Sequence, residues 1–348
     1  MYSYTYYAFG ENDLGNLKGS ESGITLSDFV VVSVDANRLT AAVSHPLVEG
    51  ITMSTTGNFF FTGTPTSLLN VTGKILTNSV SINGVLNETE TWSGGADVQQ
   101  LMDFTYTSSL LLGDDSFEGS ATFNGDDQIQ GLGGNDRFKG YGDGQFNDYF
   151  YGGDGRDTSI YRGKLSEYVV KSEDSVYDGR SDDGTRVNGH SIQDTVQSRD
   201  GKDFLIEVER LEFIDTSLAL DIAGNAGSTA KLLGATFGKA SIDNKNLVGI
   251  GLHMLDGGMS YSDLMGTVIN AVLGSTASNA AVVELLYTNV IGSAPSVNDL
   301  AFFTDWLDKG IYTKASFGVL AADTELNIVN VGLVGLASSG LEYIPYVA

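Results

Sequence analysis

The chain has 348 residues, no cysteine, and 44 acidic against 19 basic side chains, which gives a formal net charge of −25. Such a chain offers no basic face to neutralise phosphates, which argues against nucleic acid as a partner. The lack of cysteine excludes disulfide bonds and a cysteine nucleophile. No apolar run approaches the roughly 20 residues of a membrane span, so we expect the protein not to be transmembrane.

Residues 1–112 are predicted to form a sandwich-like β domain. Short runs of β-branched and aromatic residues alternate there with Gly, Asn and Ser, which is typical of strands separated by turns. The clearest runs are Phe29 to Val34, Asn58 to Thr62 and Val80 to Val85. The length of the chain predicts two or three domains, so further domains are expected after this one.

A short unit recurs between residues 113 and 161, in which an acid follows a turn residue and an apolar side chain often comes two positions later. The acids are Asp115, Asp127, Asp136, Asp148 and Asp157, and the first four are followed by Phe117, Ile129, Phe138 and Phe150. Successive acids are 12, 9, 12 and 9 residues apart, so alternate acids are always 21 apart. Glycine permits the tight turns, a carboxylate can bind a cation, and the apolar residue can enter a core.

The best copy of the unit is Gly152-Gly153-Asp154-Gly155-Arg156-Asp157, and Gly131 to Lys139 follows closely. The unit resembles the nonapeptide repeat of the RTX family, which is found in proteins exported by bacterial type I secretion. The resemblance implies a parallel β-roll with calcium-binding turns over residues 113–222, and Ca²⁺ as the cofactor.

The resemblance also implies a calcium site between stacked turns. One repeat would make half a turn of the coil, so the acids would form two rows, one of Asp115, Asp136 and Asp157 and one of Asp127 and Asp148. In the cleanest pair of turns, the implied ligands are the carboxylates of Asp136 and Asp157 and the carbonyls of Gly131, Gly133, Gly153 and Gly155. Calcium takes about six to eight oxygen ligands in flexible geometry, which suits this mixture. The alternative is a solvated acidic loop, which five units in register disfavour.

Val208-Glu209-Arg210-Leu211-Glu212-Phe213 resembles the segment that ends the roll in this class. Before it, residues 171–202 are rich in Asp, Gly and Ser and are expected to form a surface loop excursion. The acids Asp178, Asp182 and Asp183 are interpreted as solvated, with an ion site as the alternative. Residues 113–222 carry 24 acidic and 11 basic side chains, so repulsion would oppose folding until a cation neutralises it.

Residues 223–348 show apolar residues at helical spacing, and we expect a C-terminal helical domain. Ser296-Val297-Asn298-Asp299, an acidic variant of a capping box, predicts a helix that ends before Gly310. The region resembles the helical module of unknown function that often follows calcium repeats in secreted bacterial proteins. Phe302, Phe303 and Trp306 are predicted to belong to its core.

The sequence gives no sign of an enzyme. Its three histidines, His45, His190 and His253, lie far apart and none belongs to an H-E-x-x-H zinc motif. A G-x-S-x-G nucleophile elbow is also missing. His45 and His190 are predicted to be surface loop residues, and a divergent hydrolase remains a weaker hypothesis.

The sequence therefore predicts a multidomain β-plus-α protein with an N-terminal β domain (1–112), a parallel β-roll (113–222) and a helical domain (223–348). The first residues lack the basic and apolar regions of a cleaved signal peptide. We expect an extracellular protein exported by the type I secretion machinery, with its export signal in the helical domain.

The leading functional hypothesis is a calcium-binding structural protein, similar to calcium-dependent bacterial S-layer proteins. It would assemble as a homo-oligomer or polymer into a layer, filament or matrix. Two β-prone runs, Val30-Val31-Val32 and Phe59-Phe60-Phe61, lack the Lys or Pro that guard sheet edges, and a strand at such an edge is the expected joint. The alternative is a monomeric adhesin or carbohydrate-binding protein that recognises a cell-surface polysaccharide around Trp92 and Tyr106.

Overall fold

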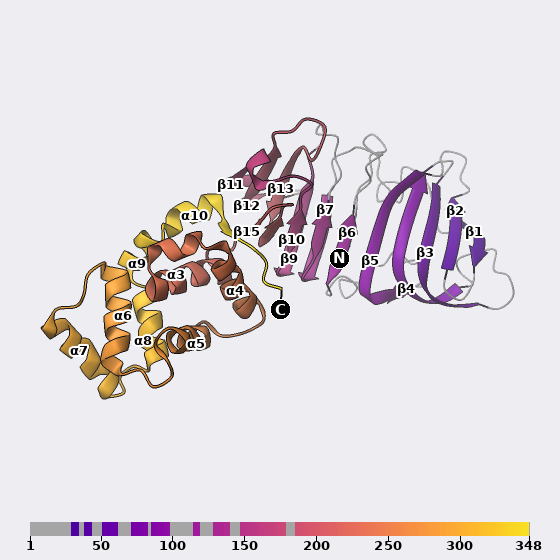
Figure 1. Cartoon of the computed structure of the whole chain (residues 1–348). Coiled ribbons are helices and arrows are strands. Elements are labelled where there is room, and N and C mark those ends of the chain that lie inside the picture. Colours follow the sequence, from indigo (N-terminus) through magenta and orange to yellow (C-terminus); the bar gives the residue numbers. More distant parts are fainter. Residues whose placement is uncertain are drawn as a thin grey trace. The chain divides into compact units, whose positions relative to one another are not determined.

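The computed structural model describes residues 29–34, 38–43, 51–61, 71–82, 85–97, 114–118, 128–139, 147–178 and 185–347. The chain forms two compact units, Met1–Ile214 and Asp215–Ala348 (Figure 1). The sequence led us to expect boundaries near residues 112 and 222.

The described part of the first unit is built almost entirely of strands. They are β1 (Phe29–Val34), β2 (Arg38–Val43), β3 (Ile51–Phe61), β4 (Val71–Ile82), β5 (Val85–Asp97), β6 (Asp115–Glu118), β7 (Gln128–Gly134), β8 (Arg137–Lys139), β9 (Tyr149–Gly155), β10 (Thr158–Ile160), β11 (Tyr168–Tyr177), β12 (Arg186–Asp194), β13 (Lys202–Ile206) and β14 (Arg210–Glu212). A short 3₁₀ helix, Leu165–Glu167, precedes β11.

The first sheet is mixed. Within this unit its strand order is β1-β2-β3-β4-β5-β6-β8-β10-β14. Neighbours from β1 to β6 pair antiparallel, as a meander. The pairs from β6 to β14 are parallel. β1 therefore lies at the end of the sheet. In β3, residues 52–56 are paired with both β2 and β4, whereas Phe59 to Phe61 pairs with β4 alone among the described strands, so the expectation of an edge there stays a prediction.

The second sheet is mixed as well, with the order β11-β12-β13-β9-β7. β11, β12 and β13 pair antiparallel, and β13, β9 and β7 pair parallel. The expectation that residues 171–202 form a loop excursion is wrong, because most of the described part of this segment belongs to strands β11 and β12. The physical reason is cross-strand pairing, because β11 pairs with β12 as an antiparallel hairpin and β12 continues onto β13.

The predicted fold class, with a parallel β-roll as the middle domain, is wrong. Two mixed sheets and the eight α-helices of the described residues make this an α/β protein. The physical reason is edge pairing, because an unpaired strand edge recruits the nearest extended segment. β5 adds antiparallel to β6 on one sheet, and β12 adds antiparallel to β13 on the other.

Apolar side chains from the two sheets of the first unit meet in its core. Phe138 of β8 stacks on Phe150 of β9, with ring centroids 5.4 Å apart. Ile129, Leu205 and Leu211 are at most 1% exposed. Each such side chain contributes roughly 1.5–3 kcal/mol by leaving water. The apolar positions of the repeat therefore build the core that holds the turns in place.

All described α-helices belong to the second unit. They are α3 (Asn225–Phe237), α4 (Lys245–Asp256), α5 (Tyr261–Leu273), α6 (Asn279–Ile291), α7 (Val297–Asp308), α8 (Lys314–Ala322), α9 (Glu325–Asn330) and α10 (Leu333–Ser339). The unit also has a 3₁₀ helix, Lys239–Asp243, and an antiparallel pair of short strands, β15 (Ser217–Ala219) and β16 (Leu341–Tyr343), which joins its two ends.

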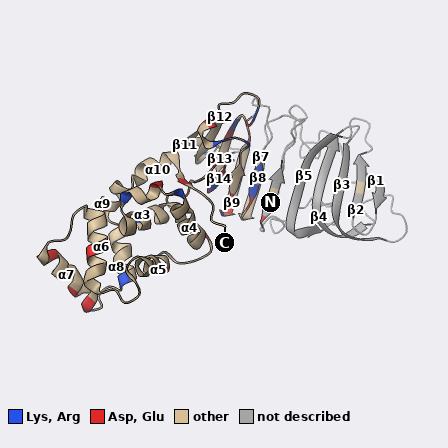
Figure 2. Ribbon diagram, in the orientation of Figure 1, with Lys and Arg blue, Asp and Glu red and all other residues tan. Residues whose placement is uncertain are grey.

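Side-chain caps begin most of these helices. Five of them start after a Ser or Thr whose hydroxyl accepts the N–H of the residue three positions later, and the caps are Ser260, Ser278, Ser296, Thr313 and Thr324. The helix predicted from the Ser296 cap is confirmed as α7, and Gly310 follows it with φ 69°. α6 and α7 carry acidic but no basic side chains (Figure 2).

One expectation for α7 is wrong. Phe302 is 56% exposed, whereas Phe303 and Trp306 are half-buried against the apolar core of the second unit. Phe303 and the buried Leu307 are four residues apart and share one helix face, which turns Phe302 outward. None of the helices in the described ranges is both long and apolar enough to cross a bilayer.

Candidate metal centre in the stacked turns

Two buried aspartates lie on neighbouring turns of the first unit. Asp136 lies between β7 and β8, Asp157 lies between β9 and β10, and both are 0% exposed. The main-chain N–H of Asp136 donates to Asp157 Oδ1 over 2.8 Å. The flanking strands pair in parallel with Phe138 opposite Ser159. The 21-residue spacing of the acids is therefore the register of these parallel strands.

A parallel row of exposed contacts runs one position before the aspartates. Asp114 Oδ1 accepts the main-chain N–H of Asn135 at 2.7 Å and its Nδ2 at 3.0 Å. Asn135 Oδ1 accepts the N–H of Arg156 at 3.1 Å. Each of these side chains thus orients a main-chain N–H of the following turn. These contacts account for the outer face of the turns without a metal ion.

The inner aspartate oxygens lie beside main-chain carbonyl oxygens. A Cβ added at Gly131 would collide with Asp136 Oδ2 and come within 2.7 Å of the Gly152 carbonyl oxygen. A Cβ added at Gly152 would collide with both Asp157 Oδ2 and the Glu207 carbonyl oxygen. Glycine is thus needed at both positions, and each forms the floor of a small cradle lined by acceptor atoms.

Asp157 Oδ2 is the clearest sign of a missing partner at these turns. The atom is buried and accepts no hydrogen bond from the part of the chain that the structure describes. A buried carboxylate oxygen without a donor is costly. A cation that bridges it to a neighbouring carbonyl oxygen would remove that cost. Carboxylate and carbonyl oxygens are also the donors that calcium prefers, so the residues fit this metal.

The pKa of the Asp157 carboxyl reflects its burial and its acidic neighbours. Burial raises the pKa of the Asp157 carboxyl to about 8, and the charges of Asp136, Glu209 and Glu207 raise it further, against the hydrogen bond from the Asp136 N–H, which lowers it. The charges that raise this pKa belong to acidic side chains. The turns therefore bring acidic groups together at a buried position, where the charged form of Asp157 is disfavoured unless a cation is bound.

A second acidic pair lies on the opposite row of turns. Asp148, which precedes β9, and Asp203, at the start of β13, are each 3% exposed. The N–H of Asp148 donates to Asp203 Oδ1 over 3.3 Å. Burial raises the pKa of Asp203 well above its usual range, and the charge of Asp148 acts in the same direction.

The other predicted ligands are placed less fully. Asp115 begins β6 and is paired with Trp92 of β5, although its side chain is not described, and Asp127 lies outside the described residues. Gly153 and Gly155 have φ of 103° and 138° and lie against the carbonyls of Leu132 and Gly134. Ligand roles for the carbonyls of Gly131, Gly133, Gly153 and Gly155 stay predictions.

In the described ranges, no three His, Asp or Glu side chains converge in the way that an all-side-chain metal site requires. A site at these turns would therefore draw part of its ligands from the main chain, as the cradles at Gly131 and Gly152 offer. This is compatible with calcium, which accepts carbonyl oxygens, and less so with metals that prefer nitrogen or sulfur.

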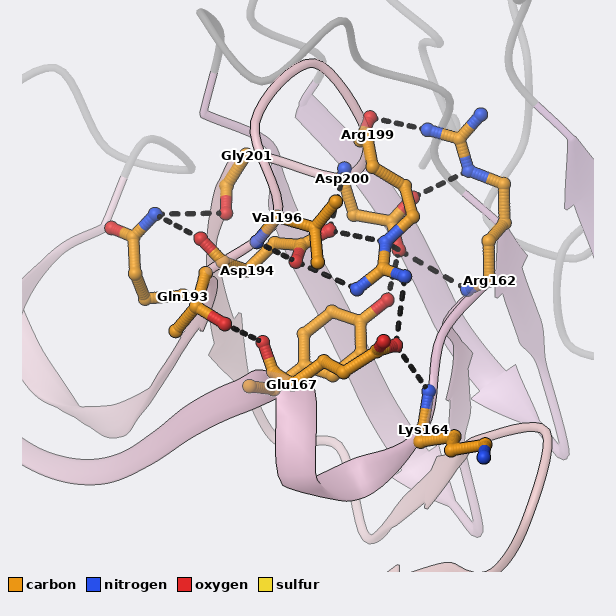
Figure 3. A network of polar contacts seen from close by, with 11 residues as sticks. Arg162, Lys164, Glu167, Gln193, Asp194, Val196, Arg199, Asp200 and Gly201 are labelled. Atoms are coloured by element: carbon orange, nitrogen blue, oxygen red, sulfur yellow. Dashed lines mark hydrogen bonds and ion pairs between the residues drawn. The ribbon is translucent and has the colours of Figure 1, made fainter.

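A separate charged network fixes the turn between β12 and β13 (Figure 3). Arg199 donates from Nε and Nη2 to the two carboxylate oxygens of Asp194, at 2.6 and 2.8 Å, and from Nη1 to Glu167 at 2.8 Å. Asp200 Oδ1 accepts Nε of Arg162 at 2.5 Å. Because each of these carboxylates has cationic donors, the network is a structural clamp rather than a metal site.

The clamp lowers the pKa of two acids. Burial alone would raise the pKa of Asp194, but the hydrogen bonds from Arg199 and from two main-chain N–H groups outweigh it and leave the pKa below its usual value. The hydrogen bonds from the Lys164 N–H and from Arg199 lower the pKa of the exposed Glu167. Both acids are therefore held in their charged form.

Sequence reasoning missed two acids that join the rows. Glu209 Oε2 accepts the N–H of Asp157 at 2.8 Å, and Asp203 accepts that of Asp148. Glu209 follows Asp157 by 52 residues rather than 21, and Asp203 follows Asp148 by 55, so the repeat spacing could not find them. The only available signal was the segment from Val208 to Phe213, which resembles the end of such repeats.

The two described histidines, His190 and His253, do not belong to a cluster of metal-ligating side chains in the described ranges. His190 lies in β12 and is half-buried, not in a surface loop as expected, and burial lowers its pKa. His253 is in the last turn of α4, and His45 lies outside the described residues. The expectation that the protein is not an enzyme stays a prediction.

No protein-family model matches the chain, and comparison with curated proteins gives no match either.

Proposed function

We propose that this is a secreted, calcium-binding structural protein that self-assembles outside the cell. The observation that carries the calcium part is the buried Asp157 Oδ2 beside the Glu207 carbonyl oxygen, without a donor among the described residues. A divalent cation there would join neighbouring turns and neutralise acids that otherwise repel each other. Binding free energy would then add directly to folding free energy.

The expected affinity follows from the number and flexibility of the proposed ligands. Extracellular calcium modules typically bind in the range of about 0.1–1 mM. Main-chain carbonyls of glycine-rich turns and one carboxylate per turn form a site of moderate charge, which agrees with that range. Export by the type I secretion machinery is part of the proposal and rests on the RTX resemblance alone.

The assembly part is supported by the position of β1. In the strand order β1 is terminal, and no described strand pairs with its outer side. Its sequence, Phe-Val-Val-Val-Ser-Val, contains neither charge nor proline. Natural sheets usually protect such an edge with Lys or Pro. A second copy of this chain could add a strand there and continue the sheet, giving a homo-oligomer or polymer.

The assembly experiment compares the molar mass of the full chain by light scattering with calcium and with chelator. We expect large assemblies in calcium that Val31→Lys in β1 reduces to monomers. Val169→Lys is the matched control, because Val169 is an exposed residue on β11, the terminal strand of the other sheet. The control should assemble as wild type does.

A monomer at high concentration, whatever the calcium level, would contradict assembly and favour the alternative of a monomeric adhesin that binds a cell-surface polysaccharide. That alternative places the polysaccharide site around two aromatic residues. Trp92 lies in β5 without a described side chain, and Tyr106 lies outside the described residues.

A further inference from the structure

The closing segment, residues 207–209, is not part of the glycine-aspartate repeat. It nevertheless lies where the next turn of the repeat would lie. β13 pairs in parallel with β9, with Phe204 opposite Tyr149, and β14 pairs in parallel with β10, with Arg210 opposite Thr158. Residues 207–209 therefore connect two strands that lie directly beside the turn 152–157. This connection is shorter than a repeat turn. Paired residues are therefore 55 positions apart in β13 and β9 but only 52 apart in β14 and β10.

Glu209 repeats the contact that the repeat aspartates make. Asp157 Oδ1 accepts the N–H of Asp136 at 2.8 Å, and Glu209 Oε2 accepts the N–H of Asp157 at the same distance. On the opposite row, Asp203 accepts the N–H of Asp148. β13 and the connection that follows it thus supply one acid to each row of turns.

Glu207 supplies the main-chain part of the same arrangement. Its φ is 55°, in the left-handed region that residues other than glycine rarely adopt. In this conformation its carbonyl oxygen lies beside Asp157 Oδ2, above Gly152. The Gly152 carbonyl oxygen lies beside Asp136 Oδ2 in the same way, above Gly131. The closing segment therefore copies the cradle of the preceding turn.

We propose that the turn 152–157 and the segment Glu207 to Glu209 form a calcium site of their own, which ends the row of sites. Its ligands would include Asp157 Oδ2, the Glu207 carbonyl oxygen and the carboxylate of Glu209. This inference rests on the proposed calcium-binding function and adds a ligand that lies outside the glycine-aspartate repeat.

The position of this site gives it a structural consequence. Glu209 and Asp157 belong to segments 52 residues apart, with β11 and β12 between them. A cation there would join the end of the repeats to the start of β14, so its binding should protect the closing segment itself against opening.

The experiment counts bound calcium ions on the full chain by native mass spectrometry. Glu209→Gln keeps an oxygen that can accept the Asp157 N–H but loses the charge, and we expect it to bind one ion fewer than wild type. Glu212→Gln, three residues further along β14, is the matched control and should bind the wild-type number, because Glu212 pairs with Arg137 instead. Glu207→Gly should also bind the wild-type number, since only its carbonyl is needed.

Wild-type stoichiometry in Glu209→Gln, with calcium still bound, would overturn this inference and leave the proposed function intact. Absence of calcium from wild type would overturn both. If Glu209→Gln does not fold, amide hydrogen exchange of the wild-type protein tests the inference instead. The amides of residues 207–212 should exchange more slowly in calcium than in chelator, and unchanged exchange there would overturn the inference.

Discussion

Asp157 Oδ1 accepts the main-chain N–H of Asp136 over 2.8 Å, while Oδ2 of the same carboxylate is buried without a donor in the described part of the chain. We therefore assign two separable roles to this carboxylate. The first oxygen holds the register of neighbouring turns, and the second oxygen is the proposed cation ligand.

Replacing Asp157 by Asn should separate these roles. The amide oxygen can keep the contact with Asp136, and the amide nitrogen can donate toward the Glu207 carbonyl, so in chelator the variant should be as stable as wild type or about 1 kcal/mol more stable. In calcium it should be less stable, because the charged ligand is lost. Urea unfolding followed by circular dichroism in both conditions measures this reversal of sign.

The control for that experiment is Asp154→Asn, since Asp154 is exposed on the same turn. It should change stability little in either condition. If Asp157→Asn destabilises equally in calcium and in chelator, Asp157 acts through hydrogen bonding and packing alone.

Gly153→Ala should test how tightly the turns stack. Gly153 has φ 103°, and its added Cβ would collide with the carbonyl group of Leu132 on the neighbouring strand. Gly258 has φ 89° with nothing near its Cβ position. Alanine at Gly258 should lower the free energy of unfolding by about 1 kcal/mol from backbone strain alone. Alanine at Gly153 should lower it clearly more. Equal losses in urea unfolding would mean that the neighbouring strand yields easily.

Arg199→Met should destabilise the first unit in a pH-dependent way. The pKa of Asp194 and of Glu167 is lowered in the folded protein, so their contribution is present above the unfolded pKa, near 4, and is lost as the pH falls through the folded pKa. At pH 7 the free energy of unfolding of the variant should therefore be about 3 kcal/mol lower than that of wild type, because the buried carboxylate of Asp194 loses its partner. Below pH 3 the difference should be much smaller.

Arg186→Met is the control for the pH experiment. Arg186 lies on the same hairpin but donates to Ser175 rather than to a carboxylate. Its effect on urea unfolding should be the same at both pH values. A loss in Arg199→Met that does not change with pH would contradict a role for the two carboxylates.

The aromatic residues of the second unit should differ strongly in their contribution. Phe317 is 6% exposed within the helical core, and its replacement by Ala should cost about 3–5 kcal/mol. Phe302 is 56% exposed, so Phe302→Ala should cost less than about 1 kcal/mol. Thermal unfolding of both variants measures the difference, and comparable losses would show that Phe302 is covered in solution.

The features that the sequence predicted well are those with a local or repeated signal. The 21-residue spacing of Asp136 and Asp157 appears as strand register, because stacked turns must repeat the same geometry. The α7 cap at Ser296 could be predicted because its hydrogen bond spans only three residues. The burial of Ile129, Phe138 and Phe150 followed from their constant position after the acids.

The features that the sequence did not predict depend on distant segments. Antiparallel addition of β5 and β12 to the parallel strands turned the expected β-roll into two mixed sheets, and no local pattern specifies which edge a strand will join. Glu209 and Asp203 enter the acidic rows only because β13 and β14 return beside β9 and β10. The outward position of Phe302 depends on which face of α7 meets the core.

We expect calcium bound at the stacked turns to stabilise the first unit. The most direct measurement is urea unfolding of the full wild-type chain, followed by far-ultraviolet circular dichroism, at a series of free calcium concentrations from chelator to several millimolar. The midpoint of the β-rich transition should rise with the logarithm of calcium concentration above the dissociation constant. A midpoint that is the same in calcium and in chelator would contradict calcium binding at these turns.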